Sequence, residues 1–309
     1  MSEPQSWEHQ TLEKLAFSAI REQRRARHWG IFFKVLTFIY LFVLLFVAMD
    51  WIGPGGGAIG NHTALIDIQG VIGAEGEVTS ENTISSLQSA FDDKHTKGVI
   101  LRINSPGGSP VQAGIINDEI RRLRKLHPKI PVYAVVEDIC ASGGYYIAVA
   151  ADKIYVDKAS IVGSIGVIMD GFGFTGTMDK LGVERRVLTA GQNKALLDPF
   201  SPLKAQDRQF ALGLLDEIHQ QFIQVVREGR GNRLKESPDI FSGLFWSGET
   251  SLKLGLADAL GSYDMVARDV IKEKNIVDFT VREGLADRFA KRFGAAMANT
   301  LGGSAIKLH

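Results

Sequence analysis

The sequence is poor in cysteine, and its charges cancel. One residue of 309 is cysteine, Cys140, so neither an intramolecular disulfide nor a thiolate zinc site can hold the fold together. The 35 Lys and Arg residues equal the 35 Asp and Glu residues in number, which gives no sign of a polycation that binds nucleic acid. With 45% hydrophobic residues, the chain can bury a large core. We expect no metal ion, no organic cofactor and no nucleic-acid partner.

Charge is also missing from one long stretch near the N-terminus. No charged residue interrupts Val35–Met49, and we place a transmembrane anchor at residues 31–52. A helix of that length, at about 1.5 Å per residue, crosses a hydrocarbon core of about 30 Å. Trp29 and Trp51 lie where interfacial aromatic residues occur. The segment starts too far into the chain for a signal peptide and lacks a small-x-small cleavage pattern, so a retained anchor is favoured over a signal peptide or a buried core helix.

Basic residues before the anchor define its orientation. Gly53–Thr63, just beyond the anchor, contains no Lys or Arg. By the positive-inside rule, residues 1–30 are cytoplasmic and the rest of the chain is exported. In a bacterium, this orientation predicts a single-pass protein of the inner membrane whose main domain is periplasmic or extracellular. The basic residues are Arg21, Arg24, Arg25, Arg27 and Lys34.

The rest of the chain divides by composition into a linker, a folded domain and a tail. Residues 53–62 are rich in glycine and predict a flexible tether. Residues 63–283 carry the patterned segments of the folded domain. Residues 284–309 are weakly patterned, which is typical of a frayed end.

Strand-like and helix-like segments alternate within residues 63–283. The predicted strands are 64–69, 99–103 and 131–136, with shorter candidates at 153–156 and 186–189. The predicted helices cover Ile84–Phe91, a segment that starts at Ser109-Pro110, residues 146–151, and a long amphipathic stretch at 204–230. This alternation predicts an α/β fold whose strands are largely parallel and covered by helices.

Two glycine-rich motifs follow predicted strands. Asn104–Ser109 precedes a helix, and backbone N–H groups at such a turn can face an anion, although a structural turn explains the motif equally well. In Ala141–Tyr146, Ser142 stands at a helix start, where a serine usually caps the helix. The same place suits a nucleophile, because the small neighbours admit a substrate carbonyl and the helix dipole stabilises the oxyanion.

A catalytic base for such a serine is not evident among the histidines, which fall in the N-terminal segment, in apparent linkers, at helix ends or in the tail. A lysine is the alternative base, since burial can lower the pKa of a lysine from about 10.4 toward neutrality. Lys194 is a candidate because apolar residues follow it. The histidines are His9, His28, His62, His95, His127, His219 and His309.

Four short motifs make the sequence similar to a known family. Their order resembles that of the signal peptide peptidase (SppA-type) family of membrane-anchored serine peptidases, and the resemblance covers residues 63–275. It implies a Clp protease/crotonase-like spiral of parallel strands and helices. The motifs are NSPGG at 104–108, ASGGYYIA at 141–148, GSIGV at 163–167, and GQNK at 191–194 followed by DPF at 198–200.

The resemblance also implies a role for each site residue. Ser142 corresponds to the nucleophile and Lys194 to the general base of a Ser/Lys dyad, and Ser164 corresponds to the serine that orients the lysine amine. The N–H groups of Gly108 and Gly143 would form the oxyanion hole. Cys140 has no histidine partner in evidence, so we interpret it as a small buried hydrophobe.

The expected function is that of a membrane-anchored serine endopeptidase that hydrolyses membrane-proximal polypeptides, including remnant signal peptides. Its expected partners are peptide substrates, the lipid bilayer and further copies of itself, because the family members form rings or domes in which neighbouring subunits can share an active site. Two alternatives stay open: a non-catalytic or acyl-transfer member of the same superfold, and a membrane-tethered scaffold that binds peptides without cleaving them. Neither needs Ser142 and Lys194 together.

Overall fold

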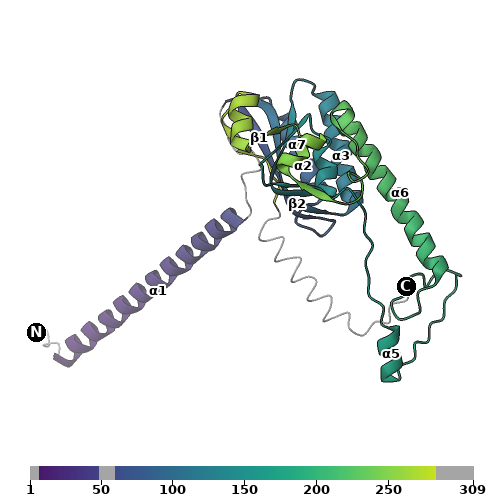
Figure 1. Cartoon of the computed structure of the whole chain (residues 1–309). Coiled ribbons are helices and arrows are strands. Elements are labelled where there is room, and N and C mark those ends of the chain that lie inside the picture. The colour runs from purple at the N-terminus through teal and green to yellow at the C-terminus, as the bar shows by residue number, and fades with distance from the viewer. Residues whose placement is uncertain (1–6, 49–59, 283–309) are drawn as a thin grey trace, which may run out of the picture. The chain divides into compact units, whose positions relative to one another are not determined.

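The computed structural model describes residues 7–48 and 60–282. Helix α1 (Trp7–Ala48) belongs to one compact unit, and the other unit spans Pro54–Val281. The second unit contains a sheet covered by helices (Figure 1). The predicted α/β class with a preceding apolar helix is therefore confirmed.

The described part of the chain forms an eight-stranded sheet in which most pairs are parallel. The strand order is β6-β5-β3-β2-β1-β8, and β4 pairs with β3 and β7. The first half of β3 pairs with β4 and its last three residues pair with β5, so the sheet divides at this strand. The strands are β1 (His62–Ile72), β2 (Thr96–Gly108), β3 (Val132–Ala141), β4 (Lys153–Val156), β5 (Ile161–Gly163), β6 (Phe245–Ser247), β7 (Ala259–Leu260) and β8 (Ile276–Asp278).

Alternating apolar residues bury both faces of the sheet. On β2, Val99 and Leu101 join the larger core cluster, while Ile100 joins the smaller one. Helices cover both faces, as parallel sheets require. The helices of this unit are α2 (Ser80–Asp92), α3 (Pro110–Leu126), α4 (Gly143–Ala148), α5 (Thr175–Leu181), α6 (Ala205–Arg230), η1 (Gly231–Arg233), α7 (Gly248–Leu254), α8 (Tyr263–Met265) and η2 (Val266–Ile271).

Four of the five predicted strands are confirmed, and the fifth is wrong. Residues 64–69, 99–103, 131–136 and 153–156 lie in β1, β2, β3 and β4, and the predicted helices match α2, α3, α4 and α6. Residues 186–189 form no strand. They lie in a segment that leaves the sheet, where Leu188 is fully exposed, so no neighbouring strand is available to pair with this apolar run.

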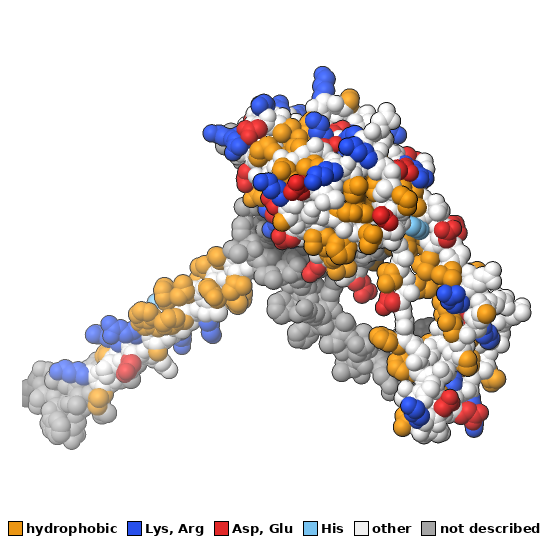
Figure 2. Space-filling view, in the orientation of Figure 1, with side chains coloured by type: hydrophobic (Ala, Val, Ile, Leu, Met, Phe, Trp, Pro, Cys, Tyr) orange, Lys and Arg blue, Asp and Glu red, His pale blue; other side chains and the backbone are white. Residues whose placement is uncertain are grey.

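The segment that leaves the sheet, residues 166–204, is called the arm below. It carries α5, a helix with no buried residue, and Figure 1 shows α5 away from the sheet. The N-terminal half of α6 also has no buried residue, whereas its C-terminal half packs onto the core through Phe222, Ile223 and Val226. Apolar side chains are exposed on this part of the surface (Figure 2).

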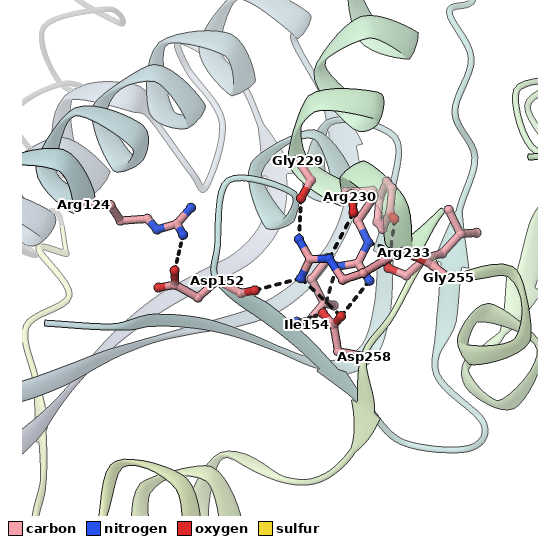
Figure 3. Close-up of polar contacts among 10 residues, drawn as sticks. Arg124, Asp152, Ile154, Gly229, Arg230, Arg233, Gly255 and Asp258 are labelled. Carbon is pink, nitrogen blue, oxygen red and sulfur yellow. Dashed lines mark hydrogen bonds and ion pairs between the residues drawn. The ribbon is translucent and has the colours of Figure 1, made fainter. Parts of the chain in front are cut away.

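A buried ion pair fixes the C-terminal end of α6 to the sheet (Figure 3). Arg230, whose side chain is 1% exposed, donates to both carboxylate oxygens of Asp258 at 2.8 and 2.9 Å. The Asp258 carboxylate also accepts the Ile154 N–H of β4 at 2.7 Å. Burial alone would raise the pKa of Asp258, but the hydrogen bond and charge of Arg230 outweigh it and hold that pKa below its usual value. Arg233 adds a further ion pair to the same carboxylate, and Arg124 pairs with Asp152 nearby.

Helix α1 is longer than the predicted anchor. It begins at Trp7, within the predicted cytoplasmic segment, and its 42 residues correspond to about 63 Å. It is long and apolar enough to cross a membrane by length and composition. Basic side chains lie toward its N-terminal end and apolar ones toward its C-terminal end (Figure 2). Trp51, residues 53–59 of the predicted linker and the tail at 284–309 lie outside the described residues.

Candidate active site

Three glycine-containing motifs meet at the carboxyl ends of neighbouring parallel strands. Strand β3 lies between β2 and β5, and the pairs Ser105–Cys140 and Ala141–Gly163 set their register. The chain therefore leaves all three strands at one edge of the sheet, where open α/β sheets bind their ligands. This register brings NSPGG, ASGG and GSIG together, although 32 residues separate the first motif from the second and 18 separate the second from the third.

Ser142 occupies a strained turn between β3 and α4. Its φ of 50° and ψ of −121° are unfavourable for a residue with a side chain, and such strain typically costs about 1–3 kcal/mol. Its N–H donates to the Gly163 carbonyl at 2.9 Å, which holds the turn in place. Ser142 stands at the N-cap position of α4, but its side chain makes no capping hydrogen bond. The N-cap interpretation is therefore wrong, and the hydroxyl is free to face the cavity described below.

The NSPGG turn packs directly against Ser142. Gly107 has a φ of 107°, and a Cβ there would lie 2.7 Å from the Ser142 Cβ, so only glycine fits. The Gly108 nitrogen lies 3.3 Å from the position a Gly143 Cβ would take. Ser105, which is fully buried, accepts the Gly107 N–H at 3.2 Å and donates to the Gly70 carbonyl at 2.7 Å. These contacts place the peptide groups of Gly108 and Gly143 beside Ser142.

Ser164 follows β5 and is fixed by its backbone. Its N–H donates to the Leu244 carbonyl at 2.7 Å, and its φ is 53°. The preceding Gly163 lies against Trp246 of β6, because a Cβ there would come within 2.8 Å of the indole ring. Ser164 thus stands one residue beyond the carbonyl that holds Ser142.

A cavity of about 230 Å³ opens at Ser142. Helix α6 supplies one wall through Ile218, Gln221 and Phe222, and the Phe222 ring packs on Tyr146 with centroids 5.0 Å apart. Most of the lining is apolar, which suits an apolar peptide side chain. The remaining lining residues are Gly108, Pro110, Val111, Ser142, Gly143, Gly166, Val167 and Ile168.

Lys194 is not among the residues that line this cavity. It lies in the arm within a series of turns, its N–H donates to the Gly191 carbonyl at 3.1 Å, and its side chain is exposed. The structure therefore brings Ser142, Gly108 and Gly143 together, places Ser164 next to them through the backbone, and leaves Lys194 on a separate surface of the same chain.

The other candidate nucleophile and bases have structural roles. Burial raises the pKa of the Cys140 thiol well above its usual value, so this thiol stays protonated and inert. His219 of α6 pairs with the Ile165 carbonyl at 3.1 Å, and His127 caps α3 and packs on Phe91. No hydrogen bond between a histidine and Ser142 is present among the described residues.

Sequence reasoning missed two residues that support the site, Ser105 and Trp246. Ser105 stands inside the NSPGG motif, where the pattern indicates only a glycine-rich turn. Its buried hydroxyl is what joins this turn to β1. Trp246 lies far along the chain from GSIG, and no local pattern indicates that β6 pairs with β5 antiparallel.

A family model and a curated relative indicate the family of this chain. A family model described as peptidase family S49 matches residues 124–277. A protein of Enterococcus faecium that carries the name signal peptide peptidase SppA is 30% identical over 235 residues, which are 74% of this chain and 68% of that protein. The structure of a ClpP1 mutant from Listeria monocytogenes has a TM-score of 0.41 and 15% identity, covering 64% of this chain and 91% of that one.

A further relative is much longer than this chain. The Na(+)/H(+) antiporter NhaA of Brucella abortus (strain 2308) is 50% identical over 193 residues, which are 62% of this chain and 26% of that protein. The chain therefore spans about a quarter of the antiporters that it matches.

Proposed function

Because the chain belongs to peptidase family S49, we propose that it is a membrane-anchored serine endopeptidase whose nucleophile is Ser142 and whose general base is Lys194. The observation that carries the proposal is the strained Ser142 turn, whose uncapped hydroxyl opens onto an apolar cavity between two glycine peptides. Backbone strain of this kind clusters at catalytic sites.

The proposed reaction is acyl transfer in two steps. The neutral Lys194 amine takes the proton from Ser142 Oγ as this oxygen attacks the scissile carbonyl, and Ser164 orients the amine. The developing oxyanion accepts hydrogen bonds from Gly108 and Gly143 at the start of α4, whose N-terminal dipole adds stabilisation. The protonated amine then protonates the leaving amine, and a water molecule hydrolyses the acyl-enzyme by the reverse proton path.

We propose that Lys194 reaches Ser142 of a neighbouring copy of the chain. Lys194 is exposed in the arm, and large apolar side chains of the arm are exposed with it. A surface in water rarely exposes so many large apolar side chains of one segment unless a partner covers them. A second copy would cover the arm and exclude water from the lysine, as a neutral amine requires. The most exposed of these side chains are Ile168, Phe172, Leu181 and Leu188, at 83, 79, 72 and 100%.

Mixing two inactive variants tests the shared site. We expect Ser142→Ala and Lys194→Ala each to be inactive alone, and co-assembly at equal amounts to restore about a quarter of the wild-type activity, because one site in four receives both groups across a head-to-tail interface. The measurement is peptide hydrolysis by co-expressed, differently tagged chains purified through both tags.

The control is a mixture of Ser142→Ala with the double variant, which has no copy able to supply the missing serine and stays inactive. Mixed assemblies that contain both tags and recover no activity would contradict a site shared between copies. So would full activity in a chain that is monomeric under the assay conditions.

We propose that α1 anchors the enzyme in a bacterial inner membrane with its N-terminus in the cytoplasm. The catalytic unit then lies on the outer side, where the anchor raises the effective concentration of membrane-proximal substrates such as remnant signal peptides. The basic residues before the apolar part of α1 support this orientation.

Labelling from one side of the membrane tests the orientation. An impermeant maleimide added to spheroplasts should label Lys274→Cys but not Ile20→Cys, because position 274 is exposed on the proposed outer side and position 20 lies before the anchor. The native Cys140 is buried and gives no background. Labelling of Ile20→Cys alone would show the opposite orientation and would contradict the proposed substrates.

A further inference from the structure

The Asp198 carboxylate holds together the part of the arm that carries Lys194. Its side chain is 8% exposed, although most of the arm is exposed. Its Oδ2 accepts the Ser201 hydroxyl at 2.6 Å and the Arg185 Nε–H at 2.9 Å. The Ser201 hydrogen bond, with the Phe200 N–H and the charge of Arg185, holds the pKa of Asp198 below its usual value, so this group is ionised at neutral pH.

Aromatic contacts extend this cluster to both ends of α5. The Arg185 guanidinium lies over the Phe200 ring, 5.1 Å from its centroid. Phe200 stacks on Phe174 with centroids 5.4 Å apart, and the Phe174 N–H donates to the Pro199 carbonyl at 2.7 Å. The DPF motif therefore joins the segment before α5, the segment after it and the turn that follows Lys194.

Overlapping hydrogen-bonded turns span the residues from Lys194 to Asp198. Leu197, beside Asp198, has a φ of 56°, a conformation that persists only where the surroundings determine it. A shift of Asp198 therefore moves the lysine backbone. The turns are the N–H to carbonyl pairs Lys194–Gly191 at 3.1 Å, Leu196–Asn193 at 3.1 Å and Asp198–Ala195 at 3.3 Å.

We infer that Asp198, through its contacts with Arg185 and Ser201, is a positioning residue that sets where the Lys194 amine enters the active site. The inference rests on the proposed role of Lys194 as the base. It gives the DPF motif a role in the reaction, although none of its residues lines the cavity at Ser142.

Asp198→Asn tests the inference, because asparagine keeps the shape and removes the charge that pairs with Arg185. We expect kcat per active site to fall about 10-fold to 100-fold, the loss typical of a misplaced catalytic group. KM should stay near the wild-type value, since the lining of the cavity is unchanged. The rise of kcat/KM with pH should move to more alkaline pH, because an amine that is held less firmly spends more time in water, where its charged form is favoured.

Two further variants complete the design. Glu184→Gln is the matched control: it removes a carboxylate of the same arm that is 73% exposed and pairs with Arg186 at 3.1 Å, and it should keep the wild-type kcat and pH profile. Arg185→Gln should lower kcat as Asp198→Asn does. In the double variant, the fold-decrease in kcat should be smaller than the product of the two single fold-decreases, because the two residues form one cluster.

The outcomes separate this inference from the proposed function. Wild-type kcat and pH profile in Asp198→Asn, with Lys194→Ala inactive in the same assay, would overturn the inference and leave the dyad in place. Asp198→Asn could instead lower only the fraction of enzyme molecules that are active, as counted with a covalent active-site label, while kcat per active site and the pH profile stay unchanged. That result would also overturn the inference, because it is what loss of a purely structural contact produces. An active Lys194→Ala enzyme would instead contradict the proposed function, in which Lys194 is the general base.

Discussion

Replacing Ser142 with alanine is expected to abolish peptide hydrolysis while the fold and the membrane insertion stay intact. Loss of a serine nucleophile lowers kcat by several orders of magnitude, on the order of 10⁴-fold or more, because oxyanion stabilisation and binding alone supply little of the rate. Folding should be preserved because the Ser142 side chain caps no helix and the alanine variant keeps the same backbone turn. The measurement is hydrolysis of a fluorogenic peptide, with thermal unfolding as the check on the fold.

Ser85→Ala provides the matched control, since Ser85 is exposed on α2 and away from the three strand ends that form the site. It should have wild-type activity. Wild-type turnover in Ser142→Ala would eliminate Ser142 as the nucleophile, whereas a wild-type protein that binds the peptide without hydrolysing it would favour the peptide-binding scaffold.

Replacing Lys194 with arginine is expected to inactivate the enzyme almost as completely as replacing it with alanine. A guanidinium group does not lose its proton at accessible pH, so it cannot take the proton from Ser142 Oγ although it keeps the positive charge. In the wild type, activity should rise with pH on a single ionisation above neutrality, because only the neutral amine acts as a base and its fraction grows as pH rises. The measurement is kcat/KM from about pH 6 to 10 for the wild type and both variants.

Assembly is the control for the lysine variants, because Lys194 lies in the arm that we expect a second copy to cover. Size-exclusion profiles of Lys194→Arg and of the wild type should coincide. Substantial activity in a correctly assembled Lys194→Arg protein would rule out Lys194 and return the search for the base to His127 and His219, each of which would first have to leave the contact it makes here.

The central part of the fold was predictable because it depends on local patterns. Runs of buried β-branched residues locate β1, β2 and β3, and Ser109-Pro110 marks the start of α3, where the Ser109 side chain accepts the Gln112 N–H. The strand predicted at 186–189 failed because an apolar run identifies a strand only when another strand lies beside it. In the arm no such partner is present among the described residues, and the apolar side chains are exposed instead.

The site was predictable as three separate motifs but not as an arrangement. The serine and glycine residues at the predicted strand ends point to Ser142 and its glycine neighbours. The order of the motifs along the chain then resembles that of a known family. The contacts that build the arrangement join distant segments: Ser105 with Gly70, Ser164 with Leu244, and α6 with the cavity. The exposure of Lys194 could not be predicted either, because the apolar residues after it are equally consistent with burial in its own chain and with burial against another copy.

Covalent labelling of the full chain with a fluorophosphonate probe, followed by peptide mapping, tests the account most directly. The account predicts that the wild-type protein is labelled on Ser142 alone, that Ser142→Ala takes no label, and that Lys194→Ala is labelled far more slowly because the hydroxyl is no longer activated. Labelling on a different serine, or no labelling of an assembled protein that still hydrolyses peptide, would contradict a Ser142 nucleophile activated by Lys194.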